Sequence, residues 1–236
     1  MMRSRLLLTT ALLVVAVVCG LLGVWQLSRL KQRRATNAVA LAARSAPVVV
    51  LSGTLPDSSL ANHRMRAKGR YDHTHDIVLR SRTYRGVPGV EIVSPLVLED
   101  NQQKAVLVNR GFVPSADAMT VDLTALREPG AARVEGIALP IDTGPGVPLR
   151  RGALTTWARL DRKALEAELP YHIYPFYIRQ SPESASSGFP RRLDAPAVDD
   201  GPHLNYAIQW FAFAGMAVIF AGIMARQKRV DRPAPR

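Results

Sequence analysis

The sequence contains a single cysteine, Cys19, so no disulfide bond can form within the chain. It therefore also lacks the thiolate pairs that soft metals such as copper prefer, which argues against thiol-based copper delivery. Among common enzyme signatures, Gly-x-Ser-x-Gly, a phosphate-binding glycine-rich loop and His-Glu-x-x-His are all missing. These absences argue against an enzyme, and they leave any folded domain dependent on its own hydrophobic core.

Acidic residues are also scarce, with 19 Asp and Glu against 31 Lys and Arg and a formal net charge of +12. Such an excess is compatible with nucleic acid, with an anionic membrane surface or with acidic partners. Many of the basic residues lie next to two long uncharged segments, at residues 3–5, 29–34 and 226–236. Cations in such places lie at the depth of lipid headgroups, and no zinc-finger spacing or aromatic-basic RNA motif accompanies them. We therefore expect a lipid bilayer, and no nucleic acid, as a partner.

The first uncharged segment runs from Leu6 to Val24. At about 1.5 Å per residue it covers close to 30 Å, the thickness of the hydrocarbon core. A cleaved signal peptide is the alternative, but the apolar stretch is longer than the usual h-region and no small-x-small cleavage site precedes Arg29. The sequence thus predicts an uncleaved transmembrane helix over residues 6–25.

The second uncharged segment, Tyr206–Ala225, is followed at once by Arg226 and a basic tail. A buried helix of a soluble protein is the alternative, but the tail is typical of a stop at a cytoplasmic interface. We predict a second transmembrane helix over residues 203–225. Residues 1–5 and 226–236 are then cytoplasmic and residues 26–202 extracytoplasmic, an orientation that the nearly even distribution of basic residues favours only weakly.

Between the two spans the pattern predicts a β-rich domain. The first helix is expected to continue over residues 26–44, before Pro47. Short β-rich runs follow, bounded by turn residues such as Gly86–Gly89, and one short helix is expected at Asp161–Leu169. The expected strands are Met65–Tyr71, Ile77–Tyr84, Val90–Leu98, Ala105–Asn109, Arg133–Leu139 and Ile173–Ile178. The fold class is therefore an α+β membrane protein, whose mainly antiparallel sheet is curled into a partial barrel.

His73-Thr74-His75 is the most obvious metal-binding candidate. On a strand, residues two apart share a face, so the two imidazoles would converge. A metal-dependent enzyme built on this pair is one hypothesis. The alternative is a solvated hydrogen-bonding edge, because the sequence offers no evident third ligand.

His203 lies at the mouth of the second predicted span. On a helix, Tyr206 and Trp210 follow it along one stripe, while Trp25 and Gln26 occupy the mouth of the first span. If the spans pack together, an imidazole and several aromatic rings would surround one site, and haem iron accepts an axial histidine. The alternative is an interfacial aromatic belt in which His203 makes a hydrogen bond at the start of a helix.

Several segments of the chain resemble, in the same order, the signatures of the Surf1/Shy1 family of cytochrome c oxidase assembly proteins. They are Leu22–Leu27 with Arg29, Gly69–Asp72, Val106–Pro114 around Asn109-Arg110-Gly111, Trp157–Asp161, and His203–Phe211. The first and last of these contain the two mouths of the predicted spans. The resemblance thus covers nearly the whole chain.

This resemblance implies a non-enzymatic assembly factor in a bacterial cell membrane, with its domain on the extracytoplasmic side. Its partners would be the catalytic subunit and other subunits of a haem-copper oxidase, and its transient cofactor haem a. His203 matches the family's proposed haem ligand, with Trp25, Tyr206 and Trp210 as packing walls and Gln26 as a polar contact. Arg110 is either structural or meets a haem propionate. A purely structural accessory protein, stably bound to the oxidase without any cofactor, is the alternative.

Overall fold

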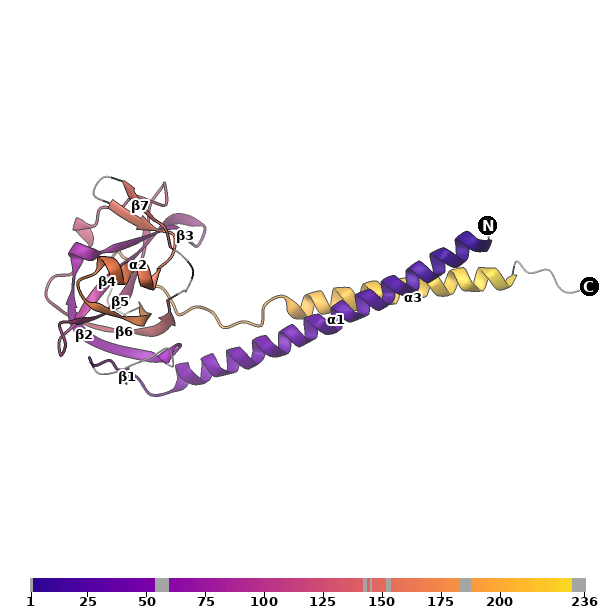
Figure 1. Ribbon diagram of the computed structural model, residues 1–236, viewed down its shortest axis with the longest axis horizontal. Coiled ribbons are helices and arrows are strands. Elements are labelled where there is room, and N and C mark those ends of the chain that lie inside the picture. The colour runs from indigo at the N-terminus through magenta and orange to yellow at the C-terminus, as the bar shows by residue number, and fades with distance from the viewer. Residues whose placement is uncertain are drawn as a thin grey trace, which may run out of the picture. The chain divides into compact units, whose positions relative to one another are not determined.

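The computed structural model describes residues 2–53, 60–141, 144, 146–151, 154–182 and 188–230 (Figure 1). The chain separates into two compact units. The helical unit comprises the segments up to Val39 and from Val198 onward, and the β domain comprises Ala40–Ala197. We treat each unit separately.

The helical unit is formed by α1 (Met2–Ser45) and α3 (His203–Val230), both long and apolar enough to cross a membrane. α1 is uninterrupted, which confirms the expected continuation past Trp25 until shortly before Pro47. In each helix only 17% of the most apolar stretch is buried. Large side chains such as Leu21 and Phe220 are exposed, which suits lipid and disagrees with the core helix of a soluble protein.

Small residues line the contact between α1 and α3. The buried positions of α1 are Ala16, Cys19, Gly23 and Leu30, at successive spacings of three, four and seven residues. Those of α3 are Ala207, Ala217 and Ala221, at successive spacings of ten and four residues. A Cβ atom on Gly23 would lie 2.7 Å from the ring of Phe211, so a larger residue there would require that ring to move. Close approach through small residues is the usual way in which membrane helices associate. The two helices run antiparallel, because Gly23 meets Phe211 while Gln26 meets His203.

The β domain contains nine strands in its described residues. They are β1 (Val49–Val50), β2 (Arg64–Tyr71), β3 (Ile77–Tyr84), β4 (Val87–Leu98), β5 (Lys104–Pro114), β6 (Ala131–Pro140), β7 (Pro148–Arg151), β8 (Leu154–Trp157) and β9 (His172–Gln180). The helical elements are α2 (Arg162–Glu168) and the 3-10 turns η2 (His73–His75) and η3 (Thr124–Leu126). Five strands and α2 were predicted close to their observed bounds, and β5 was predicted five residues too short at its end. The short strands β1, β7 and β8, with two to four residues each, were not predicted.

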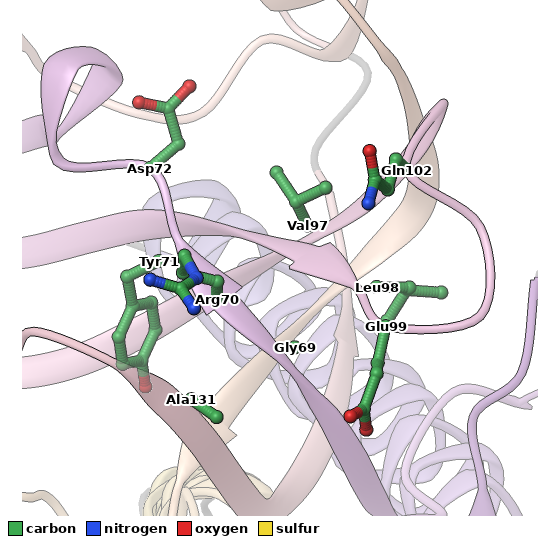
Figure 2. Close-up of a pocket in the computed structure, with 9 residues that line it drawn as sticks. All are labelled: Gly69, Arg70, Tyr71, Asp72, Val97, Leu98, Glu99, Gln102 and Ala131. Carbon is green, nitrogen blue, oxygen red and sulfur yellow. The ribbon is translucent and has the colours of Figure 1, made fainter.

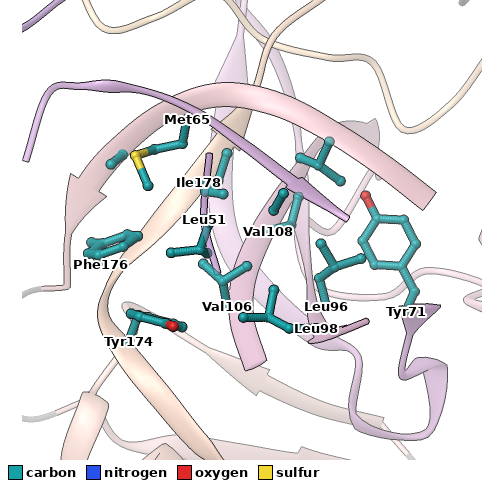
Figure 3. Close-up of a cluster of buried hydrophobic side chains, with 13 residues drawn as sticks. Leu51, Met65, Tyr71, Leu96, Leu98, Val106, Val108, Tyr174, Phe176 and Ile178 are labelled. Atoms are coloured by element: carbon teal, nitrogen blue, oxygen red, sulfur yellow. The ribbon is translucent and has the colours of Figure 1, made fainter. Parts of the chain in front are cut away.

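The sheet closes into a barrel. Its strand order is β1-β2-β6-β9-β5-β4-β3-β8-β7, and β2 also pairs with β4 through Gly69↔Leu98 to Tyr71↔Leu96. The ring β2-β6-β9-β5-β4 is therefore complete, where the sequence led us to expect a partial barrel. Apolar side chains from all five ring strands fill one cluster, including Met65, Val106 and Phe176 (Figure 3). Closure buries this cluster and gives the ring strands no free edge.

Most strand pairs are antiparallel, as predicted, but β1–β2, β5–β9 and β3–β8 are parallel. β5 and β9 can pair in parallel because a long connection through β6, β7, β8 and α2 separates them, whereas a hairpin turn would make them antiparallel. The hairpin between β3 and β4 also differs from the expected Gly86–Gly89 turn. Its two turn residues are Arg85 and Gly86, with φ of 50° and 81°, as a type I′ turn requires, so the three residues that follow belong to β4.

Asn109-Arg110-Gly111 forms a β-bulge in the middle of β5. Ile92 pairs with Gly111 and Val93 with Asn109, which leaves Arg110 as the extra residue. Gly111 has a φ of +124°, and its N–H donates to Asn109 Oδ1 at 3.0 Å. The bulge therefore explains why this motif combines a glycine with an amide side chain. It also places Arg110 with its side chain fully buried.

Candidate functional site

The mouths of the two apolar helices are joined by a hydrogen bond between His203 and Gln26. His203 is the first residue of α3, and its Nδ1 lies 2.9 Å from Gln26 Oε1. Both side chains are half-buried. Two of the five predicted site residues thus meet directly.

This contact determines which nitrogen of the His203 imidazole donates a hydrogen bond. An amide oxygen can only accept, so Nδ1 carries the proton and donates it to Gln26 Oε1. Nε2 then has a free lone pair, and no described residue makes a hydrogen bond to it. Histidines that ligate metals are commonly held in this way, with one ring nitrogen bonded to an oxygen and the other available. The residues at the helix mouths therefore fit an axial ligand of haem iron.

An open hollow of about 550 Å³ adjoins His203. Its lining comes from the α1 segment after Gln26 and from the turn before α3: Arg29, Gln32, Arg33, Thr36, Asp199, Gly201, Pro202 and His203. Most of its lining residues have polar side chains, including two arginines but only one acidic residue. Apart from His203, these residues were not predicted as site residues. The signal that could have indicated them is the helical spacing of Arg29, Arg33 and Thr36, which follow Gln26 at i+3, i+7 and i+10.

The turn before α3 is held in place by side chains of α1. Asn37 Nδ2 and Arg33 Nε donate to the carbonyl oxygen of Asp199 at 2.7 and 3.2 Å, and Arg34 pairs with Asp200 at 2.8 Å. Gly201, with a φ of +66°, then turns the chain into α3. These contacts fix the start of α3, and with it the position of His203 beside Gln26.

The three aromatic residues predicted as walls do not line this hollow. Trp25 is 53% and Tyr206 47% exposed, while Trp210 is half-buried and makes an edge contact with Phe213 at 6.0 Å between ring centroids. Successive helical residues are rotated by about 100°, so Trp25 points away when Gln26 faces α3. Trp25 and Tyr206 are oriented instead as the residues of an interfacial belt are.

The His73-Thr74-His75 segment forms the 3-10 turn η2, so the predicted strand geometry is wrong. Each histidine has its own carboxylate: His73 Nδ1 lies 3.0 Å from Asp76 Oδ2, and His75 Nδ1 lies 2.7 Å from Asp72 Oδ2. A 3-10 turn does not place residues two apart on one face. Nowhere in the described chain do three or more His, Cys, Asp or Glu residues gather in a way that would hold a metal ion.

Arg110 has a structural environment within the β domain. Its guanidinium is fully buried, donates to the Leu126 carbonyl and to Glu128 Oε1, the latter at 2.8 Å, and lies 5.1 Å from the ring centroid of Tyr71. Arg192 also pairs with Glu128, at 2.6 Å. Burial acts to raise the pKa of Glu128, but the hydrogen bonds and charges of the two arginines outweigh it, so this pKa lies below its usual value. Of the two roles considered for Arg110, these contacts favour the structural one.

A second hollow, of about 520 Å³, lies on the β domain where β2 pairs with β4. Figure 2 shows Tyr71 and Ala131 on one side of it, Leu98, Glu99 and Gln102 on the other, and Arg70 between them. It contains none of the predicted site residues. Histidine and cysteine are absent from its lining, so it offers no imidazole or thiolate ligand.

Comparison with known proteins gives a consistent result. The sequence profile of the SURF1 family matches residues 13–215, from within α1 to the middle of α3. The chain is 27% identical to a SURF1-like protein of Rickettsia felis, over 87% of this chain and 91% of that protein. It is also 27% identical to a SURF1-like protein of Monosiga brevicollis, over 88% and 84% of the two chains. An uncharacterized SURF1-like protein of Mycobacterium bovis matches at 27% identity over 97% and 89%.

Proposed function

Because the chain belongs to the SURF1 family, we propose that it is a non-enzymatic assembly factor for a haem-copper cytochrome c oxidase, which helps haem a to reach or remain in the catalytic subunit. The family match spans both apolar helices and the β domain between them.

The observation that carries the haem proposal is the state of the His203 imidazole. Gln26 holds Nδ1 at 2.9 Å and leaves Nε2 with its lone pair. Haem iron, when bound, accepts such a neutral nitrogen as an axial ligand. Gln26 orients the ring and selects its tautomer.

We place the protein in a bacterial cell membrane, with residues 26–202 on the extracytoplasmic side. The two apolar helices and their outward-facing large side chains support insertion in a bilayer. Two spans put both termini on one side. The basic residues from Arg226 onward favour the cytoplasmic side for the termini.

A structural accessory protein without a cofactor is the second candidate. The outward orientation of Trp25 and Tyr206, as in an interfacial belt, is the observation that favours it. Under this alternative the protein co-purifies with mature oxidase at a fixed stoichiometry and carries no haem of its own.

Absorption spectroscopy of protein purified from cells that make haem a tests the proposal. Wild-type protein is expected to carry haem, and His203→Ala to lose most of it, because the axial ligand is removed. His172→Ala is the matched control, since His172 is an exposed histidine of the β domain. Equal haem content in wild type and His203→Ala would remove the ligand assignment.

Gln26→Leu tests the orienting hydrogen bond separately. We expect haem affinity to fall by about 10–100-fold, as is usual when the partner that orients a metal-ligating histidine is lost. Haem titration of the detergent-solubilised chain measures this effect. Gln209→Leu, an exposed glutamine on α3, should bind haem like the wild type. An unchanged affinity in Gln26→Leu would mean that Gln26 does not position the ring.

A further inference from the structure

Two arginines beside His203 carry charges that no carboxylate of the described residues neutralises. Arg29 Nη1 donates to Gln32 Oε1 at 3.1 Å, and Arg33 Nε donates to the Asp199 carbonyl oxygen at 3.2 Å. Both acceptors are neutral amide oxygens, and within the described residues neither arginine forms an ion pair. Each guanidinium has five N–H donors, so each retains donors for a ligand.

Arg34, one residue further along α1, provides the contrast. Its Nε lies 2.8 Å from Asp200 Oδ2, so its charge is paired. Arg34 is absent from the lining of the hollow, whereas Arg29 and Arg33 are part of it. The unpaired cations therefore face the hollow that adjoins His203, and the neutralised one does not.

The hollow carries a net positive charge. Its lining has two cations, Arg29 and Arg33, and one anion, Asp199, whose Oδ1 accepts the N–H of Gly201 at 2.9 Å. The N-terminus of α3 at His203 adds the partial positive charge of a helix start. An anionic ligand is thus favoured over a neutral or cationic one.

The position of the hollow restricts that anion further. Arg29 and Arg33 follow Gln26 at i+3 and i+7, along one stripe of α1. At about 1.5 Å per residue, they lie roughly 8–14 Å beyond Val24, the last residue of the uncharged segment. A ligand bound to both His203 and these arginines must therefore combine a metal, an apolar body that reaches the bilayer and acidic groups at its outer end.

Haem has this combination, with two propionate carboxylates on one edge of an apolar macrocycle. We propose that Arg29 and Arg33 bind the haem propionates while His203 Nε2 faces the iron, a role that rests on the haem-binding function proposed above. The planar guanidinium matches a carboxylate through two parallel hydrogen bonds. This assignment gives the propionate contact to the helical unit, whereas Arg110 is occupied within the β domain.

Titration with two ligands tests the proposal. Haemin and haemin dimethyl ester, in which both propionates are neutral esters, are added to the full chain in a neutral detergent. The variant Arg29→Met/Arg33→Met is expected to bind haemin at least tenfold more weakly than wild type, and the dimethyl ester equally well. The position of the Soret band is expected to stay unchanged, since His203 is retained. Lys31→Met, the matched control, removes an exposed cation of the same helix that does not line the hollow, and it should behave as wild type with both ligands.

The outcomes separate the two proposals. Wild-type haemin affinity in the double variant would overturn the propionate assignment, and so would an equal loss for haemin and its ester. If the arginines bind lipid phosphate instead, the double variant in phosphatidylcholine nanodiscs would bind haemin as the wild type does. It would bind phosphatidylglycerol more weakly than the wild type. If His203→Ala keeps its haem, the assignment of His203 as the haem ligand fails, whatever the arginine variants do.

Discussion

Arg110→Met is expected to lower the free energy of unfolding of the β domain by about 3 kcal/mol or more. The guanidinium is fully buried, and its removal leaves the Leu126 carbonyl and Ser94 Oγ without a donor. It also leaves Glu128 with Arg192 as its remaining partner in this cluster. Methionine fills much of the volume but supplies no hydrogen bond.

Urea unfolding of the full chain in detergent measures this loss. Trp157 is only 2% exposed and reports on the core of the β domain once Trp25 and Trp210 are replaced by phenylalanine. Arg133→Met serves as the control, because Arg133 is exposed and surface substitutions usually change stability by less than about 0.5 kcal/mol. A loss below about 1 kcal/mol in Arg110→Met would show that the buried cluster contributes little.

Gly111→Ala is expected to destabilise the same domain by about 2–5 kcal/mol. A Cβ at this position would lie 2.1 Å from the carbonyl oxygen of Arg191, a backbone atom that cannot rotate away. Arg191 exchanges two backbone hydrogen bonds with Phe112, at 2.9 and 2.8 Å. The added methyl group must therefore push this segment from the barrel, in addition to straining a φ of +124°.

Gly130→Ala separates the clash from the strain. Gly130 also has a positive φ, of +94°, but a Cβ there would meet nothing within 4 Å. We expect the free energy of unfolding of this variant to fall by about 1–2 kcal/mol, because only the backbone conformation is strained. The same urea titration compares the two variants. Equal losses would mean that the contact with Arg191 does not matter.

Local patterns were sufficient to predict most of the strands. Ile77–Tyr84 was predicted with its observed bounds, since alternating side chains and flanking turn residues are local signals. Ala105–Asn109 was predicted too short, because Arg110-Gly111 looks like the end of a strand when the bulge that continues it is unknown. The parallel pairing of β5 with β9 was missed, since it joins residues far apart in the sequence.

The part of the candidate site that could be predicted is the part that depends on which residues share one face of a helix. His203 and Gln26 were chosen for their places at the mouths of two spans, and antiparallel packing brings them together. Trp25 was assigned to the same site, although its place next to Gln26 turns it outward. Arg29 and Arg33 were interpreted only as charges flanking a membrane helix, because the turn at Gly201 that completes the hollow is not visible in the sequence.

Closure of the barrel limits how another protein can attach to this domain. In the described chain, the sheet ends at β1 and β7, which have two and four residues. Long unpaired edges invite a foreign strand or a second copy to extend the sheet, and edges this short offer too few backbone groups for that. A binding partner must therefore recognise side chains and loops. Short edges likewise protect the domain against edge-to-edge aggregation.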